Sequence, residues 1–195
     1  MSNKYLKTDE REEVISNLEM LADTLSKIKE DLYNWKWAIL SLHSSLQGFM
    51  VLALRGGNGL NCLRDKIKKE WLKAYNENTP LPDEKLDSFL NLYNKIQKSD
   101  SMKFTIKSRI YVPKGNEKWS VKKLNSLRNE FIHFVPKGWL LEISGLPNIF
   151  NDCINIIDFL FKESGNIDWY KMELEKRVKN SINDIRNKLD NIENV

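Results

Sequence analysis

Apolar residues recur in alternating steps of four and three along the first quarter of the chain. The series starts at Val14 and continues through Leu18, Leu21, Leu25, Ile28, Leu32, Trp35, Ile39, Leu42 and Leu46 to Phe49. This spacing places all of these side chains on one side of an α-helix. It predicts one very long helix, or two collinear helices, which the glycine-rich residues 56–59 bring to an end.

Helical periodicity returns in five later segments. Their predicted bounds are about 60–76, 83–98, 121–135, 147–163 and 168–194. The sequence therefore predicts an all-α protein, a helical bundle of about five to six helices with long N- and C-terminal helices.

Two segments between these helices lack the helical period. In 102–117, the apolar residues Phe104, Ile106, Ile110 and Val112 sit at even spacing, and 139–143 is a second extended candidate. This spacing predicts short strands or extended loops. The two segments would form either one small β-hairpin or an extended flap. Because residues 102–117 contain several lysines, this segment is either a candidate for contact with RNA or an ordinary basic surface loop.

The last predicted helix carries an apolar stripe that cannot remain exposed. Its natural partner is the first helix, whose early turns carry a similar stripe, and the pairing can occur within one chain or between two. We interpret residues 1–195 as a single domain. Its core is at about 35–165, and 9–34 with 168–194 form a terminal helical arm.

Composition narrows the class of protein but not its function. Charged residues make up 30% of the chain and hydrophobic residues 41%, which is typical of a compact, soluble protein rather than a disordered one. The net charge of +4 permits binding to a polyanion but does not require it.

Cysteine usage and hydropathy indicate a cytoplasmic protein without a metal. Cys62 and Cys153 match no metal-ligand spacing, and no secretory signal precedes them, so free thiols in a reducing compartment are expected. Residues 37–54 are apolar enough to suggest a membrane span, but polar residues such as His43 and Gln47 interrupt them. They predict a buried core helix and no membrane association.

The richest chemistry lies in Arg128-Asn129-Glu130-Phe131-Ile132-His133, within the predicted helix 121–135. Ser120 is the expected N-cap and Pro136 must end the helix. One arc of this helix is apolar and faces the core. Lys122, Ser126, Asn129 and His133 form a polar stripe on the other side, with Arg128 at its edge.

An arginine, an amide and a histidine suit a ribonuclease that works without a metal ion. RNA supplies its own nucleophile, the ribose 2′-hydroxyl, so the protein needs only to move protons and to stabilise charge. A histidine can transfer the protons. A guanidinium can hold the phosphate through two parallel hydrogen bonds. Since one chain supplies one such histidine here, two copies around a two-fold axis would build a more complete site.

The motif Arg-Asn-x-x-x-His, late in an α-helical domain, resembles the signature of the HEPN superfamily. The wider stretch from Leu124 to Trp139 and the segment from Ala38 to Gln47 resemble small bacterial HEPN-like proteins, and the resemblance covers roughly residues 35–165. It implies an all-α, usually dimeric domain, often an RNA-cleaving toxin or phage-defence effector. It assigns Arg128 and His133 as catalytic and Asn129 as supporting.

Around this motif, Lys122, Ser126 and Lys137 are candidate substrate-binding residues, and no metal ligand or cofactor is expected. The alternative for Arg128 and His133 is a solvated polar face with a capping histidine. For His43, the alternatives are a buried, hydrogen-bonded structural histidine and, with Gln47, a group that points into the groove.

The function expected is a metal-independent endoribonuclease that cleaves RNA through 2′-hydroxyl attack at a composite site in a homodimer. The setting expected is a toxin–antitoxin pair or phage defence, with an antitoxin or a larger defence protein as a further partner. The alternative is a non-catalytic, all-α dimerisation or adaptor protein in such a complex.

Overall fold

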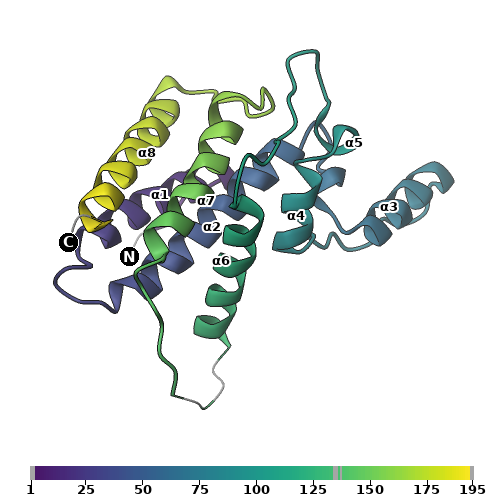
Figure 1. Ribbon diagram of the computed structural model, residues 1–195. Helices are drawn as coiled ribbons and strands as arrows, with labels where there is room; N and C mark the ends of the chain where they lie inside the picture. Colours follow the sequence, from purple (N-terminus) through teal and green to yellow (C-terminus); the bar gives the residue numbers. More distant parts are fainter. Residues whose placement is uncertain (1–2, 134–135, 137, 194–195) are drawn as a thin grey trace.

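The computed structural model describes residues 3–133, 136 and 138–193, and within these it contains eight α-helices, one 3-10 turn and no strand. The predicted all-α fold is thus confirmed (Figure 1). The elements are α1 (Glu10–Ser26), α2 (Asn34–Leu54), η1 (Leu60–Cys62), α3 (Asp65–Glu77), α4 (Phe89–Lys95), α5 (Ser99–Met102), α6 (Glu117–Ile132), α7 (Leu146–Lys162) and α8 (Met172–Glu193).

The first two helices form an antiparallel hairpin, so the prediction of one continuous or two collinear helices was wrong. Ser45 of α2 donates a hydrogen bond to the carbonyl of Val14 in α1, and Arg55 after α2 pairs with Glu10 at the start of α1. The turn at 27–33 is closed by the Asn34 amide, which donates to the carbonyls of Lys27 and Asp31. The apolar stripe of the heptad series therefore folds back upon itself.

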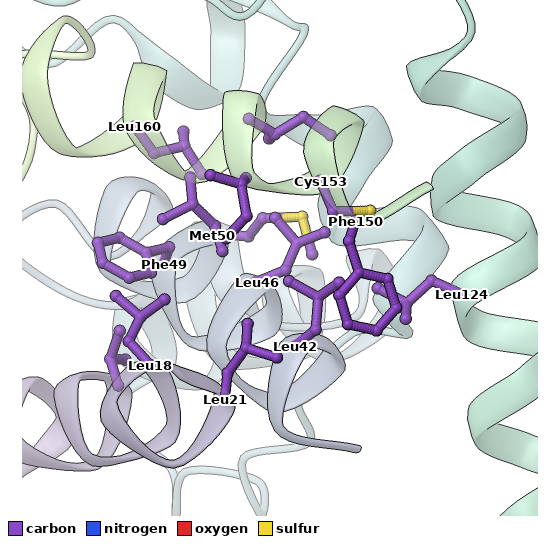
Figure 2. Close-up of a cluster of buried hydrophobic side chains, with 14 of the residues drawn as sticks. Leu18, Leu21, Leu42, Leu46, Phe49, Met50, Leu124, Phe150, Cys153 and Leu160 are labelled. Carbon is purple, nitrogen blue, oxygen red and sulfur yellow. The ribbon is translucent and has the colours of Figure 1, made fainter. Parts of the chain in front are cut away.

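Helix α2 is the central helix of the bundle and packs against α1, α4, α6 and α7. Figure 2 shows how its side chains Leu42, Leu46, Phe49 and Met50 meet Leu18 and Leu21 from one side and Phe150 and Cys153 from another. By length and composition α2 could cross a membrane, yet 67% of its most apolar stretch is buried inside the protein. Such burial is typical of the core helix of a bundle, as predicted for residues 37–54.

The two terminal helices pair within one chain and lie side by side in Figure 1. Arg177 of α8 forms ion pairs with Glu12 and Glu19 of α1 at 2.8 and 2.7 Å. Lys188 donates to the carbonyl of Ala22 at 3.0 Å. The apolar residues of both helices, Leu18, Leu25 and Ile185 among them, belong to the same hydrophobic cluster as α2 and α7.

The segment between α5 and α6 is an extended loop, and no hairpin forms between it and 139–143 in the described part of the chain. Its backbone is tied down at two points, where the N–H of Arg109 donates to Ser164 and the N–H of Tyr111 donates to Ile96, both at 2.9 Å. Both acceptors lie just beyond the end of a helix, Ser164 after α7 and Ile96 after α4, so these backbone hydrogen bonds do not pair the segment with a strand.

Helix α3 stands away from the other helices (Figure 1), and within it only Ala74 is buried. An ion cluster of buried Lys95 and Asp87 with the exposed Asp65 fixes its base. The ammonium of Lys95 in α4 lies 2.7 Å from a carboxylate oxygen of Asp87 and 3.0 Å from one of Asp65, and it donates to the carbonyl of Leu63 at 2.6 Å.

The α1–α2 hairpin requires a glycine at position 48. A Cβ atom there would lie 2.4 Å from Cγ2 of Val14, which is stiff because it is β-branched and buried. We expect Gly48→Ala to lower the free energy of unfolding by about 1 kcal/mol. The overpacking costs roughly 1–3 kcal/mol, and the better helix propensity of alanine returns only about 1 kcal/mol. Chemical denaturation measures the difference.

The matched control is the cycle with Val14→Ala. Truncation of Val14 should make Gly48→Ala neutral or stabilising, because it removes the methyl group that the new Cβ meets. A Gly48→Ala protein more stable than the wild type would show that the hairpin tolerates a side chain there.

Candidate functional site

Helix α6, which carries the motif, is placed by an apolar face that packs as predicted. Val121, Leu124 and Leu127 are buried, and Phe131 is half-buried with its ring centroid 4.9 Å from that of Trp139. The helix begins earlier than expected, at Glu117, and its N-cap is Asn116. The prediction of Ser120 as the N-cap was wrong, because its buried hydroxyl donates to Asp152 of α7 at 2.5 Å.

His133 lies just beyond the helix and not in its last turn, which corrects the sequence-based placement. The helix ends at Ile132, and His133 is the C-cap residue, with extended backbone and an N–H that donates to the carbonyl of Asn129. Its side chain is exposed. The candidate residue Lys137, like Phe134 and Val135 of the predicted apolar arc, lies outside the described residues.

Arg128 is half-buried on the side of α6 that faces the α1–α2 hairpin. Its Nη1 donates to Oδ1 of Asn129 at 3.0 Å. Within the described residues it has no carboxylate partner, whereas Arg55, Arg177 and Arg186 are all paired with carboxylates. The folded chain therefore leaves the charge of Arg128 available to a ligand, and Asn129 orients Arg128 rather than the histidine.

Arg128 lines a hollow of about 440 Å³ between α1, α2 and α6. We name this cavity the Arg128 hollow. Its acidic residues, Glu10 and Glu13, are both engaged. Glu10 pairs with Arg55, and Glu13 accepts a hydrogen bond from the hydroxyl of Thr8 at 2.7 Å. The full lining is Glu10, Glu13, Val14 and Asn17 from α1, His43, Ser44, Gln47, Gly48 and Val51 from α2, and Arg128.

His43 lies at the wall of this hollow, and its burial and its hydrogen bond match the alternative of a structural histidine. Its ring is buried and stacks on Phe89 with centroids 3.9 Å apart, while Nε2 lies 3.3 Å from Oδ1 of Asn125. Burial, with a smaller contribution from the nearby Arg128, lowers the pKa of His43 from 6.5 to about 4, although the hydrogen bond that His43 forms with Oδ1 of Asn125 opposes the shift. His43 is therefore neutral at physiological pH.

The structure brings some candidate residues together and separates others. Arg128 and Asn129 touch, and Arg128 shares its hollow with His43 and Gln47. Lys122 and Ser126 are exposed on the outer side of α6, and His133 is not among the residues that line the Arg128 hollow. One chain alone therefore does not place Arg128 and His133 around a single cavity.

An apolar surface lies beside the motif, and the helical periodicity did not reveal it. A groove of about 550 Å³ is bounded by the start of α2, the end of α6 and the loop before α7. It is lined by Leu32, Tyr33, Trp35, Lys36, Glu130, Phe131, Trp139, Leu140, Leu141 and Ile143, which we name the aromatic groove. Tyr33 is 76% and Leu140 100% exposed. So much exposed apolar surface commonly marks an interface.

Other reactive side chains do not form a second site. Cys62 and Cys153 are free and buried, and burial raises the pKa of Cys62 to about 11 and that of Cys153 still further. Among the described residues, no group of three or more His, Cys, Asp or Glu side chains could hold a metal ion.

Comparison with known proteins identified no matching family model, no matching curated protein and no matching solved structure. The candidate site is therefore assigned from its residues and their geometry.

Proposed function

We propose that this protein is a HEPN-like endoribonuclease that cleaves RNA without a metal ion, at a site completed by a second copy of the chain. The observation that carries the proposal is the state of the two motif side chains. Arg128 reaches an open hollow and has no carboxylate partner among the described residues, and His133 is exposed at the end of the same helix. In the part of the chain that the structure describes, neither side chain forms a hydrogen bond or an ion pair with another helix.

A homodimer explains how two separated groups can act on one phosphate. The aromatic groove includes Glu130 and Phe131, which lie between Arg128 and His133 in the sequence. If this groove packs against the same groove of a second copy across a two-fold axis, the C-terminal end of α6 in one chain approaches the C-terminal end of α6 in the other. The histidine of one chain can then serve the arginine of its partner.

The chemistry follows from these groups. His133 accepts the proton of the ribose 2′-hydroxyl, whose oxygen attacks the adjacent phosphorus, while a solvent water molecule donates a proton to the departing 5′-oxygen and the imidazolium returns its proton to solvent. Arg128 binds the non-bridging oxygens and stabilises the additional charge of the transition state. Asn129 keeps the guanidinium oriented. The products are a 2′,3′-cyclic phosphate and a free 5′-hydroxyl.

The second candidate function is a non-catalytic adaptor, and the aromatic groove is the observation that favours it. A groove with Tyr33 and Leu140 largely exposed can bind an antitoxin or a larger defence protein as well as a second copy. The toxin–antitoxin or phage-defence setting comes from the family resemblance, and the cytoplasmic location comes from the cysteine usage; both belong to this proposal.

The test is incubation of the purified full chain with total RNA, with and without EDTA, and analysis of the product ends. We expect cleavage that EDTA does not inhibit, 2′,3′-cyclic phosphate ends, and sedimentation as a dimer at micromolar concentration. A His133→Ala sample purified in parallel reports any contaminating nuclease. A dimer that leaves RNA intact under both conditions would favour the adaptor, and EDTA-sensitive cleavage would overturn the proposed chemistry.

A further inference from the structure

Positive charge is concentrated in the loop that leads into α6 and along α6 itself. Residues 103–128 contain eight lysines and arginines and a single carboxylate, although the whole chain has a net charge of only +4. Seven of the eight are exposed, namely Lys103, Lys107, Arg109, Lys114, Lys118, Lys122 and Lys123. In the part of the chain that the structure describes, none of these seven forms an ion pair.

The one carboxylate of this segment does not reduce the surface charge. Glu117 is buried and accepts hydrogen bonds from the backbone N–H groups of Lys114 and Gly115 at 3.2 and 2.7 Å. Burial alone would raise the pKa of Glu117, but these donors and the Tyr111 hydroxyl lower it below its ordinary value. The carboxylate is thus turned inward and occupied, and the lysines outside are left without a counter-charge.

An exposed aromatic ring lies among these lysines. Trp119 is 59% exposed, and Lys122, Lys123 and Ser126 follow it at helical spacing on the same side of α6. We name Trp119 with Lys118, Lys122, Lys123 and Ser126 the α6 outer face. From Trp119 to Ile132, its last residue, the helix rises roughly 20 Å, and His133 follows directly. The outer face therefore leads from the start of α6 toward the proposed catalytic histidine.

Basic side chains around an exposed aromatic ring are the combination that binds single-stranded nucleic acids, since phosphates contact the lysines and an unpaired base stacks on the ring. We propose that the α6 outer face binds single-stranded RNA, with Trp119 stacked on a base and Lys118, Lys122 and Lys123 at successive phosphates. The substrate class, RNA, rests on the proposed function. The binding surface rests on the charge and exposure of these residues.

A test of binding that does not depend on cleavage separates the two proposals. The probe is a fluorescently labelled single-stranded RNA with 2′-O-methyl riboses, which lacks the nucleophile and cannot be cut by the proposed chemistry. Fluorescence anisotropy of this probe with the full chain gives the affinity and its salt dependence. Intact binding without cleavage would contradict the proposed catalytic roles of Arg128 and His133 alone. Absence of binding would contradict the proposed role of the α6 outer face.

The first variant replaces Lys118, Lys122 and Lys123 by glutamine. We expect binding at least tenfold weaker, and a logarithmic salt slope shallower by about 2, since each lysine at a phosphate of a single strand contributes roughly 0.7. The matched control removes the same number of exposed lysines elsewhere, Lys69, Lys176 and Lys179, and should bind within twofold of the wild type. Equal losses in both variants would show that binding follows net charge and would overturn the surface.

The second variant tests the stacking. Trp119→Ala should weaken binding about tenfold, whereas Trp37→Ala, which removes another exposed tryptophan beside a lysine, should have little effect. A double-stranded probe of equal length should bind more weakly than the single strand, because its bases are not free to stack. The inference would be overturned if duplex and single strand bound equally well, or if Trp119→Ala left the affinity for the single-stranded probe unchanged.

Discussion

Arg128→Ala is expected to slow RNA cleavage by a factor of about 100 or more. Removal of one preorganised donor to a transition-state oxyanion has an effect of this size, and Arg128 is the one cationic side chain among the described residues that line its hollow. Arg128→Lys should restore little, because an ammonium keeps the charge and loses the planar fork that binds two phosphate oxygens. Rates at subsaturating RNA measure the loss, and Arg64→Ala, at an exposed arginine away from the motif, is the matched control.

The composite site gives this prediction a sharper form. Arg128→Ala and His133→Ala should each be inactive alone, yet mixed after subunit exchange they should recover about a quarter of the wild-type rate. Half of the dimers are then mixed, and one of the two sites in each mixed dimer has an intact arginine and histidine from different chains. An inactive mixture would place both groups of a site in one chain, and near wild-type cleavage by Arg128→Lys would reduce the arginine to long-range charge.

The packing of α6 could be predicted from sequence because its apolar period is local. Val121, Leu124 and Leu127 share one face of α6, and their spacing predicts that this face is buried whichever helix it packs against. The end of the helix could not be predicted to the residue, because Pro136 excludes a helix at its own position but does not determine how many turns before it are lost. The observed helix ends at Ile132, before the predicted end, and His133 therefore lies in the loop.

The α1–α2 hairpin shows a limit of a different kind. A heptad series is satisfied equally by a partner helix from another chain and by the same stripe folded back, so the spacing of Leu18 and Leu42 contains no information about a turn between them. The turn depends on Asn34, whose amide binds two backbone carbonyls of the loop. Polar contacts between distant residues have no periodic signature.

The same limit applies to the candidate site. The sequence predicted Arg128 and Asn129 as site residues, and it left two alternatives for His43. It did not predict that Glu10 and Glu13 of the first helix would share the Arg128 hollow, because their position depends on the hairpin. Nor did it predict the aromatic groove, whose residues come from three segments without a common period. Sites that tertiary packing assembles become visible only when the helices are placed.

The stability of the protein should fall by about 3 kcal/mol as the pH falls from 6.5 to 4, because of His43 alone. Its pKa is about 4 in the folded protein and 6.5 in the unfolded chain, so between these values only the unfolded chain binds the proton. This favours unfolding, and each pH unit of the interval costs roughly 1.4 kcal/mol. The stabilisation is complete above pH 6.5. Asp87 and Glu117, whose folded pKa values are lowered, contribute their losses at more acidic pH.

Chemical denaturation at pH 7.5, 6.0 and 5.0 isolates this contribution when wild type and His43→Gln are compared. Glutamine does not titrate and can still bind Asn125, but it cannot stack on Phe89 in the same way. We expect the variant to be less stable at pH 7.5 and to lose almost nothing between pH 7.5 and 5.0. A wild-type slope retained in His43→Gln would assign the acid sensitivity to another group. A smaller loss of unfolding free energy between pH 7.5 and 5.0 in Arg128→Ala than in the wild type would show that the guanidinium helps to keep His43 neutral. The stability of the hairpin would then be coupled to the residue that is proposed to bind the phosphate.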